Sequence, residues 1–536
     1  MFLFNNLSIN QVIFCCKLPL KYVLQVVRVP KNQDFVLNFK VGKMKKSFKI
    51  IIVFILVIIA PVFLQAQDVE AKVKVLPAKV QIEGKFATES QFSANKNWSF
   101  PDSYADAENL GARISNLNLL DAEGKTVSVK KFTDGEYVAD RAAKSFNYEV
   151  KTEIPEKITS TAHISWLNDN YGLLMLGDLF PQWQTSELQK ISAKITFELP
   201  FGWKVIGNEN KSGEYSFSIN DLDNAVFLVG KGWREKRAWI GKNELNFAIL
   251  GEWNFSDDEA NQIASEILHE HQRTFGEPST PKSQIFLLPF PKGDYVLNWR
   301  AETRGATVTV ISGVMPFKQQ SLQRLHEQLR HELFHFWLPN NLVLTGNYDW
   351  FYEGFTIYQA LRTGIELNYI RFDDYLYTVG ETNNVANAFE RNELTLLEIS
   401  NNRWRGSTSL LYNKGFMVAF LCDLAIIKAS KGKRNIGEVF RTVWKKYKVG
   451  KQSEDGNTAI LNILKTYPEL QDILTKYVEG KSSIQIQNEV EPFGLEVKTK
   501  GFGIELKVAE KSSGKQQDLL DKLGYNQWRK LLPQTK

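Results

Sequence analysis

Cysteine is almost absent from this chain, which contains 3 cysteines in 536 residues. Cys15 and Cys16 lie close to the N-terminus, so the long remainder of the chain holds Cys422 alone. A disulfide framework is therefore excluded for that remainder, and its stability must come from buried apolar surface. Because Cys422 lies in an apolar run, we expect a packed side chain there and not a nucleophile.

A strong charge of either sign is also missing. The chain has 66 Lys and Arg against 60 Asp and Glu, and its net charge is +6. These cations form no continuous basic stripe, and no nucleic-acid-binding motif is present, so we expect no nucleic-acid partner. The length is enough for two or three domains with cores of their own.

Long hydrophobic runs are absent from most of the sequence, but one lies near the N-terminus. A basic stretch at residues 44–49 precedes an apolar run at residues 50–64, and Gln-Ala-Gln follows at residues 65–67. This order is typical of a secretory signal peptide, here residues 44–66. Because signal peptides begin at the initiator methionine, we expect translation to start at Met44, with residues 1–43 a non-native extension.

An alternative is that the extension is genuine and that the apolar run is an uncleaved membrane anchor, although 15 residues are few for a membrane span. With the signal cleaved, we expect no membrane span and a periplasmic or secreted bacterial protein. No cysteine for lipid attachment follows the apolar run.

The most informative segment is His-Glu-Leu-Phe-His at residues 331–335. Residues four apart lie on the same face of a helix, so His331 and His335 can direct imidazoles at one zinc ion. Glu332 then lies beside the metal, where it can take a proton from water. A catalytic zinc needs a third protein ligand, and Glu353 is the candidate. Apolar residues spaced three or four apart predict a helix over residues 321–338. The alternative is an ordinary amphipathic helix with hydrogen-bonded core histidines.

Three segments resemble one family. They are His-Glu-x-x-His-x-Trp at residues 331–337, Trp-Phe-Tyr-Glu-Gly-Phe-Thr-x-Tyr at residues 350–358, and Tyr-Asn-Lys-Gly at residues 412–415. They look like the glycyl-aminopeptidase-type gluzincins, a PDZ-bearing family of metallopeptidases related to the aminopeptidase N family. The resemblance covers residues 257–447 well and the preceding region loosely. The spacing from His335 to Glu353 is closer to aminopeptidase N, which leaves the subfamily open.

The resemblance implies a role for each matching residue. The zinc ligands would be His331, His335 and Glu353, Glu332 would be the general base, and Tyr412 would stabilise the oxyanion. The cofactor would be Zn²⁺, and the partner a peptide or protein substrate. Taken without the resemblance, Tyr412 heads an apolar helix and is more typical of core packing.

One departure from the family concerns substrate binding. Aminopeptidases of these families carry a glutamate for the substrate's amino group on a glycine-rich edge strand that lines the cleft. The corresponding place here is residues 305–310, which contain no carboxylate. Glu302, just before them, is a possible substitute. The substrate-binding residues, and the choice between trimming ends and cutting internally, therefore stay open.

The pattern along the chain indicates several domains. Alternating apolar and polar residues predict an N-terminal antiparallel β-sandwich-like domain over residues 67–255. The resemblance implies a thermolysin-like zinc catalytic domain, α+β and mainly α, over residues 256–480. Residues 481–536 are expected to be a tail, a PDZ remnant or a docking hairpin. The lone His163 is given no role, and His269, His271 and His326 are not spaced to join the zinc pair.

Three functional hypotheses follow. The first is an aminopeptidase-like zinc metallopeptidase. The second is an envelope binding or scaffold protein built on the same fold, without peptidase activity. The third is hydrolysis of a non-peptide amide or an epoxide by the same metal chemistry. The sequence does not specify an oligomeric state.

Overall fold

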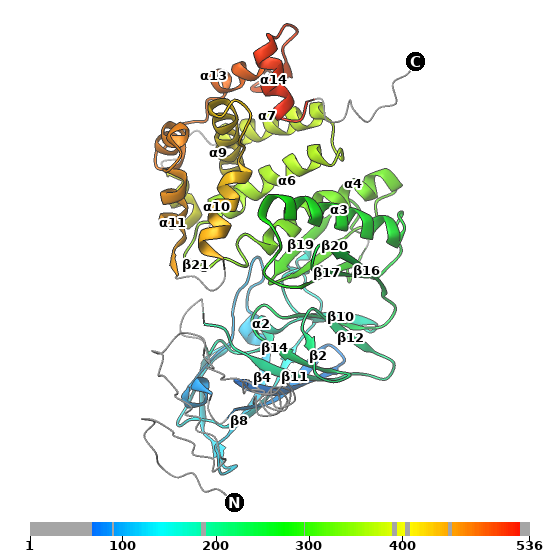
Figure 1. Cartoon of the computed structure of the whole chain (residues 1–536). Helices are drawn as coiled ribbons and strands as arrows, with labels where there is room; N and C mark the ends of the chain where they lie inside the picture. Colours follow the sequence, from blue (N-terminus) through cyan, green and yellow to red (C-terminus); the bar gives the residue numbers. More distant parts are fainter. Residues whose placement is uncertain are drawn as a thin grey trace, which may run out of the picture. The chain divides into compact units, whose positions relative to one another are not determined.

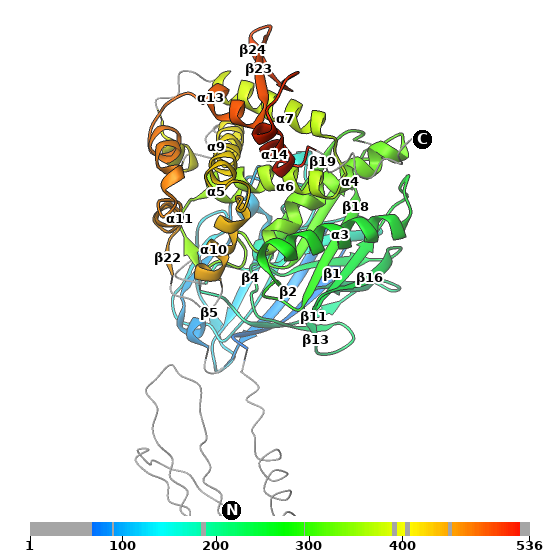
Figure 2. The same ribbon diagram turned by 45° about the horizontal axis from the view of Figure 1, so that its top comes forward.

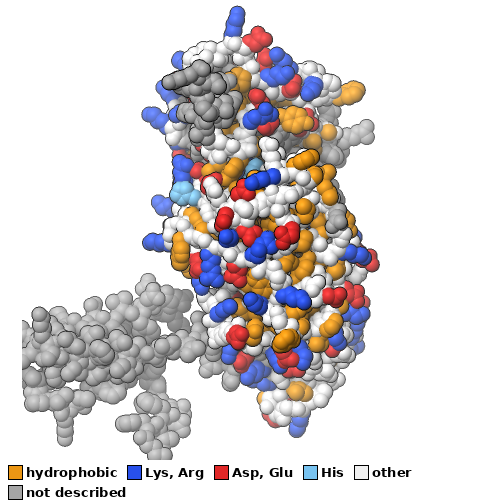
Figure 3. All heavy atoms as spheres, turned by 90° about the vertical axis from the view of Figure 1, so that its right-hand side faces the viewer, with side chains coloured by type: hydrophobic (Ala, Val, Ile, Leu, Met, Phe, Trp, Pro, Cys, Tyr) orange, Lys and Arg blue, Asp and Glu red, His pale blue; other side chains and the backbone are white. Residues whose placement is uncertain are grey.

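The computed structural model describes residues 67–87, 90–183, 189–293, 295–388, 394–401, 408–448 and 453–525. The expected extension and signal peptide lie outside these ranges. The chain from Ala66 to Lys536 forms one compact unit. Within it, the strands of the N-terminal part and the helices of the C-terminal part lie on opposite sides of a five-stranded sheet (Figure 1). Figure 3 shows one face of this unit, on which acidic and basic side chains are interspersed.

The N-terminal part is rich in β-structure, as expected. Its largest sheet has the order β13-β14-β11-β1-β2-β8-β4-β5. These strands are β1 (Val69–Leu76), β2 (Lys79–Phe86), β4 (Ile114–Leu120), β5 (Thr126–Val127), β8 (Ser145–Lys151), β11 (Ala193–Glu198), β13 (Asn210–Lys211) and β14 (Ser216–Ile219). Buried and exposed positions alternate along β1, so one face of the sheet covers a core.

Two smaller sheets complete this part. One has the order β12-β15-β10-β9 and the other β3-β7-β6. Their strands are β3 (Asn97–Ser99), β6 (Val129–Thr133), β7 (Glu136–Ala139), β9 (Trp166–Leu167), β10 (Tyr171–Met175), β12 (Lys204–Gly207) and β15 (Val226–Gly230), with helix α2 (Leu176–Leu179) between them.

The large sheet is not purely antiparallel, which corrects the expectation of an antiparallel domain. β1 pairs with β11 in parallel, from Val69 opposite Ala193 onward. Parallel neighbours need a long crossover, and more than a hundred residues separate these two strands. Short-range patterning cannot reveal such a pairing.

A five-stranded sheet lies between the β-rich part and the helices. Its order is β16-β17-β18-β20-β19, formed by β16 (Arg234–Ile240), β17 (Asn243–Ile249), β18 (Lys282–Pro289), β19 (Trp299–Arg304) and β20 (Thr307–Ser312). β17, β18 and β20 run parallel, whereas β19 runs antiparallel to β20. β20 is buried throughout, as is typical of a strand covered on both faces. β16 and β17 precede residue 256, the expected domain boundary, yet they pair into this sheet.

The expected edge strand is in the wrong place. Residues 305–310 were expected to line the cleft from the edge, but β20 lies inside the sheet, between β18 and β19. Gly305 has φ 55° and joins the two strands, a conformation that glycine adopts without strain. The strand at the edge is β19, and it carries Glu302.

Helices α3 (Asp257–Phe275) and α4 (Lys318–Glu332) cover one face of this sheet. α3 begins with a capping box between Ser256 and Glu259 and ends at Gly276. α4 is shorter than predicted, because the backbone tightens into a 3₁₀ turn over Leu333–Phe336. Packing of this turn places Phe334, Phe336 and Trp337 in the core.

Most of the remaining chain is helical. The helices are α5 (Asp349–Tyr352), α6 (Gly354–Glu366), α7 (Phe372–Ala388), α8 (Leu396–Asn401), α9 (Thr408–Ala429), α10 (Gly437–Tyr447), α11 (Gly456–Leu464), α12 (Gln471–Ile473) and α13 (Gln487–Val490), with short strands β21 (Leu344–Thr345) and β22 (Glu454–Asp455). Among the described residues, α9 alone is long and apolar enough to cross a membrane, but 83% of its apolar window is buried, as in a core helix.

The described C-terminal residues form a hairpin and a helix. β23 (Leu495–Lys500) and β24 (Gly503–Val508) pair antiparallel, and α14 (Gly514–Lys522) follows. Figure 2 shows the hairpin beside α7. Asn384 of α7 fixes the hairpin, since its amide donates to the Ile504 carbonyl and accepts the Ile504 N–H at 3.0 and 2.8 Å.

His271 of α3 makes folding stability depend on pH. Its ring packs against Phe334 and Trp337, and its Nε2 lies 3.0 Å from the Arg330 carbonyl. Burial lowers the pKa of His271 from 6.5 to about 4. The unfolded chain therefore binds more protons between these pH values, so stability falls as the solution is acidified.

We predict that this histidine removes about 2 kcal/mol of stability between pH 7.5 and pH 5. Thermal unfolding of the zinc-free protein at both pH values measures the effect. His271→Phe should show a smaller drop in Tm on acidification, whereas His269→Gln, at an exposed position of the same helix, should keep the full drop. An equal drop in His271→Phe would contradict this assignment.

Candidate metal centre

Three predicted ligands meet at one point. His331 lies in the last turn of α4, His335 in the following 3₁₀ turn, and Glu353 at the junction of α5 and α6. The two Nε2 atoms are 3.1 Å apart, and Glu353 Oε2 lies 3.5 Å from that of His331 and 3.9 Å from that of His335. Zinc bonds of about 2.0–2.2 Å at tetrahedral angles require separations of this size, so the donor set fits a zinc ion.

The orientation of His335 is fixed by the backbone. Its Nδ1 donates to the Leu338 carbonyl at 2.7 Å, which directs the lone pair of Nε2 toward the other two ligands. Burial lowers the pKa of His335, and the neighbouring His331 lowers it further. The imidazole is therefore neutral near pH 7, which is the form that binds a metal.

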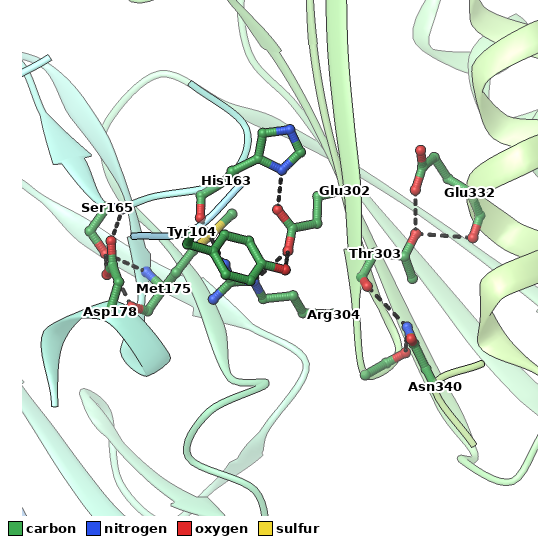
Figure 4. A network of polar contacts seen from close by, with 11 residues as sticks. Tyr104, His163, Ser165, Met175, Asp178, Glu302, Thr303, Arg304, Glu332 and Asn340 are labelled. Carbon is green, nitrogen blue, oxygen red and sulfur yellow. Dashed lines mark hydrogen bonds and ion pairs between the residues drawn. The ribbon is translucent and has the colours of Figure 1, made fainter. Parts of the chain in front are cut away.

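Glu332 lies beside the ligands and is held by the edge strand. The hydroxyl of Thr303 lies 2.7 Å from Glu332 Oε2 and 3.0 Å from the Glu332 carbonyl. Asn340 holds the same stretch of β19, because its amide donates to the carbonyls of Thr303 and Gly305 (Figure 4). The carboxylate of Glu332 is buried and oriented by a hydrogen bond, as a general base requires.

These groups open into a cavity of about 640 Å³. Tyr412 of α9 lines it together with the ligands and Glu332, so the structure brings all five predicted site residues to one cavity. Another wall of the cavity comes from the N-terminal β-rich part through Tyr104 and His163. Within the described ranges, His269, His271 and His326 join no metal-binding group, as expected from their spacing.

Glu302 forms a buried cluster on this wall. Its Oε1 accepts hydrogen bonds from Tyr104 at 2.6 Å and from Arg304 Nε at 2.7 Å, and its Oε2 contacts His163 Nδ1. Arg304 also donates to the His163 carbonyl at 2.7 Å and stacks over the Tyr104 ring. The positive charge of Arg304 offsets the cost of burying Glu302, and the pKa of Glu302 is lowered to about 2. This carboxylate is therefore ionised at the cleft.

Sequence reasoning missed most of this wall. His163 was given no role, and Thr303, Arg304 and Tyr104 were not considered. Alternation of side chains along residues 299–304 could have indicated a strand that directs Glu302 and Thr303 to opposite sides. Tyr104 and His163 come from loops more than a hundred residues away, and no spacing in the sequence relates them to Glu302.

Comparison with known proteins identifies the fold but no family. No family model matches the sequence, and no curated protein matches it. Among solved structures, an aminopeptidase N family protein from Idiomarina loihiensis matches with a TM-score of 0.67 and 16% identity, over 81% of this chain and 79% of that chain.

An M1 zinc metallopeptidase from Deinococcus radiodurans, as a mutant bound to a Tyr-Ser-Ala substrate, matches with a TM-score of 0.53 and 13% identity, over 78% of this chain and 95% of that chain. Identities this low show the fold alone. The chain has the M1 peptidase fold, with a β-rich N-terminal domain and a helical C-terminal region.

We predict that zinc binding depends on the three converging side chains. His335→Ala and Glu353→Ala should each weaken zinc binding by more than about 100-fold, because each leaves two protein ligands. Metal content after dialysis against a zinc buffer, read by plasma mass spectrometry, measures this. His269→Ala is the matched control and should keep one zinc per chain. Full zinc retention in His335→Ala would contradict the site.

Proposed function

We propose that this protein is a zinc metallopeptidase that hydrolyses peptide bonds in peptides or proteins. The observation that carries the proposal is the cavity in which two imidazoles and a carboxylate converge, with Glu332 and Tyr412 beside them. The zinc held by His331, His335 and Glu353 would supply the positive charge that acidifies water and polarises a carbonyl. The fold of M1 zinc metallopeptidases is consistent with this chemistry.

Three residues of the chain would each act in a different part of the reaction. Glu332 takes a proton from the attacking water and passes it to the leaving amine. The hydroxyl of Tyr412 donates a hydrogen bond to the oxygen on which negative charge develops. Thr303 keeps the Glu332 carboxylate directed into the cavity.

The edge strand offers a backbone on which a peptide can lie. The Asn298 carbonyl accepts the Gly313 N–H, so the backbone groups of residue 298 face β20. Alternation along β19 then turns the backbone groups of Ala301 and Thr303 away from β20, and Asn340 already occupies the Thr303 carbonyl. An extended substrate can pair with Ala301 as an added strand, independently of its sequence.

Glu302 is the group that would recognise a free amino terminus. It is the carboxylate of the edge strand, it is ionised, and it lines the same cavity as the zinc ligands. Arg304 compensates much of its charge, so the attraction for a substrate ammonium is weakened. We therefore propose an aminopeptidase-like enzyme that cleaves peptides with a free N-terminus roughly 10–100-fold more efficiently than acetylated ones. A preference of this size corresponds to the free energy of one charge-assisted hydrogen bond.

The decisive experiment compares peptides that differ only in acetylation of the N-terminus. Wild-type protein with zinc is incubated with both pools, and mass spectrometry identifies the products. We expect cleavage mainly of the free-amine pool, and Glu302→Gln should reduce that preference toward equality. Glu332→Gln should lower kcat about 10²–10⁴-fold while zinc stays bound. Absence of Glu332-dependent cleavage would instead favour the binding or scaffold protein.

Tyr412→Phe tests the oxyanion contact within the same assay. Removal of one such donor should lower kcat by about 10²–10³-fold with little change in zinc content. Tyr377→Phe, at an exposed tyrosine of α7, is the matched control and should leave kcat unchanged. Equal activity of Tyr412→Phe and wild type would remove Tyr412 from the mechanism.

Thr303 provides a test of how the base is positioned. Thr303→Val keeps the size of the side chain but removes the hydroxyl, and should lower kcat about tenfold through the misdirected Glu332. Thr303→Ser restores the hydroxyl and should restore most of the rate. If Thr303→Ser were as slow as Thr303→Val, the hydroxyl would not be what positions Glu332.

A further inference from the structure

An exposed apolar rim lies at the beginning of the edge strand, outside the cavity. It consists of Val296, Leu297, Val314 and Phe317, whose exposed fractions are 48%, 62%, 43% and 66%. The two chain segments that carry the rim are adjacent, because the Gly313 N–H donates to the Asn298 carbonyl and a Cβ on Gly313 would lie 3.2 Å from the Val296 Cα. We propose that this rim binds apolar residues of a long peptide substrate, downstream of the bond that is cut.

Leu297 has an unusual backbone conformation for its side chain. It lies in the turn closed by the Asn298 N–H and the Tyr295 carbonyl, and its φ is 72°. A leucine in the left-handed region costs roughly 1–2 kcal/mol, whereas glycine or asparagine adopts it readily. The turn thus holds a bulky apolar side chain in water at a conformational cost. Strained residues are concentrated at functional sites, so this turn adds support to the binding role proposed for the rim.

β19 runs from the rim towards the cavity. Ala301, Glu302 and Thr303 line the cavity, β19 begins at Trp299, and the turn that carries Val296 and Leu297 lies just before this edge strand. Successive residues of an added strand advance by the same 3.3–3.4 Å as those of β19. If the cut bond lies opposite residues 301–303, the substrate residues about four to six positions away reach the level of Leu297, where the turn begins.

The other end of this path is closed by the chain itself. Beyond Thr303, Asn340 bonds to the carbonyls of Thr303 and Gly305, and the cluster of Tyr104, His163 and Arg304 fills the space beside Glu302. Towards Trp299, the outward carbonyl accepts from the side chain of its own neighbour Arg300, a contact that an added strand can displace, so we place the rest of a long substrate in that direction. A peptide antiparallel to β19 has its C-terminal residues at that end, so the rim meets residues downstream of the cut.

This inference rests on the proposed peptidase function and adds a substrate class to it. The favoured substrates are peptides of at least about seven residues with large apolar side chains four to six positions after the cut. Short peptides do not reach the rim, so the rim does not increase their affinity.

The test uses three substrates that share their first four residues. One is the tetrapeptide amide, and two are nonapeptides with either three leucines or three serines at positions 5–7. For the wild-type enzyme, we expect a KM about tenfold lower for the leucine peptide than for the serine peptide. The double variant Leu297→Asn, Phe317→Ser should abolish this difference and leave tetrapeptide kinetics unchanged. Phe201→Ser, at a fully exposed turn of the β-rich domain, is the matched control.

Two outcomes would overturn the proposal: equal KM for the two nonapeptides in the wild type, or an advantage of the leucine peptide that survives the double variant. Fluorescence anisotropy of the labelled nonapeptides with Glu332→Gln measures binding without turnover. If the wild type cleaves none of the substrates, the proposed function fails. Tighter binding of the leucine peptide that depends on Leu297 and Phe317 would then still support the rim, and its absence would exclude it.

Discussion

The centre depends on one constraint, which is that two imidazoles approach each other to 3.1 Å beside a carboxylate. For His335, burial and the neighbouring His331 both lower the pKa, so its imidazole stays neutral. The Leu338 carbonyl then fixes which nitrogen of His335 faces the ligand point. The apolar residues Phe334, Phe336 and Trp337 anchor the turn in the core, so the packing that stabilises the fold also holds the ligands in place.

The β-rich domain takes part in the site as well. Tyr104 and His163 reach across to Glu302 on the edge strand, and Arg304 reaches back to the His163 carbonyl. The wall of the cavity around Glu302 is thus a shared surface, held by buried and charge-assisted hydrogen bonds. Breaking it would change both the position of Glu302 and the shape of the cleft. Under the proposed function, substrate choice would therefore depend on the packing of the β-rich domain against the edge strand.

The sequence was sufficient for what depends on local spacing. His331 and His335 are four residues apart, and a helical spacing predicted that they share one face, which the end of α4 and the following 3₁₀ turn provide. It was not sufficient for what depends on strand order. The residues of β20 were expected to form the edge strand. In the structure, β19 pairs antiparallel to β20 and takes the edge position, so that Glu302 of β19 lies at the cleft. The roles of His163 and Tyr104 depend on contacts over more than a hundred residues, which no local pattern encodes.

The account is tested most directly by a crystal structure of zinc-loaded Glu332→Gln with an uncleaved peptide. We predict zinc bound by His331, His335 and Glu353, with the peptide paired to Ala301 and its carbonyl between the metal and Tyr412. Its amino terminus should lie next to Glu302. A fourth protein ligand on the zinc, or a peptide bound away from β19, would contradict the central claim that this cavity is a peptidase site.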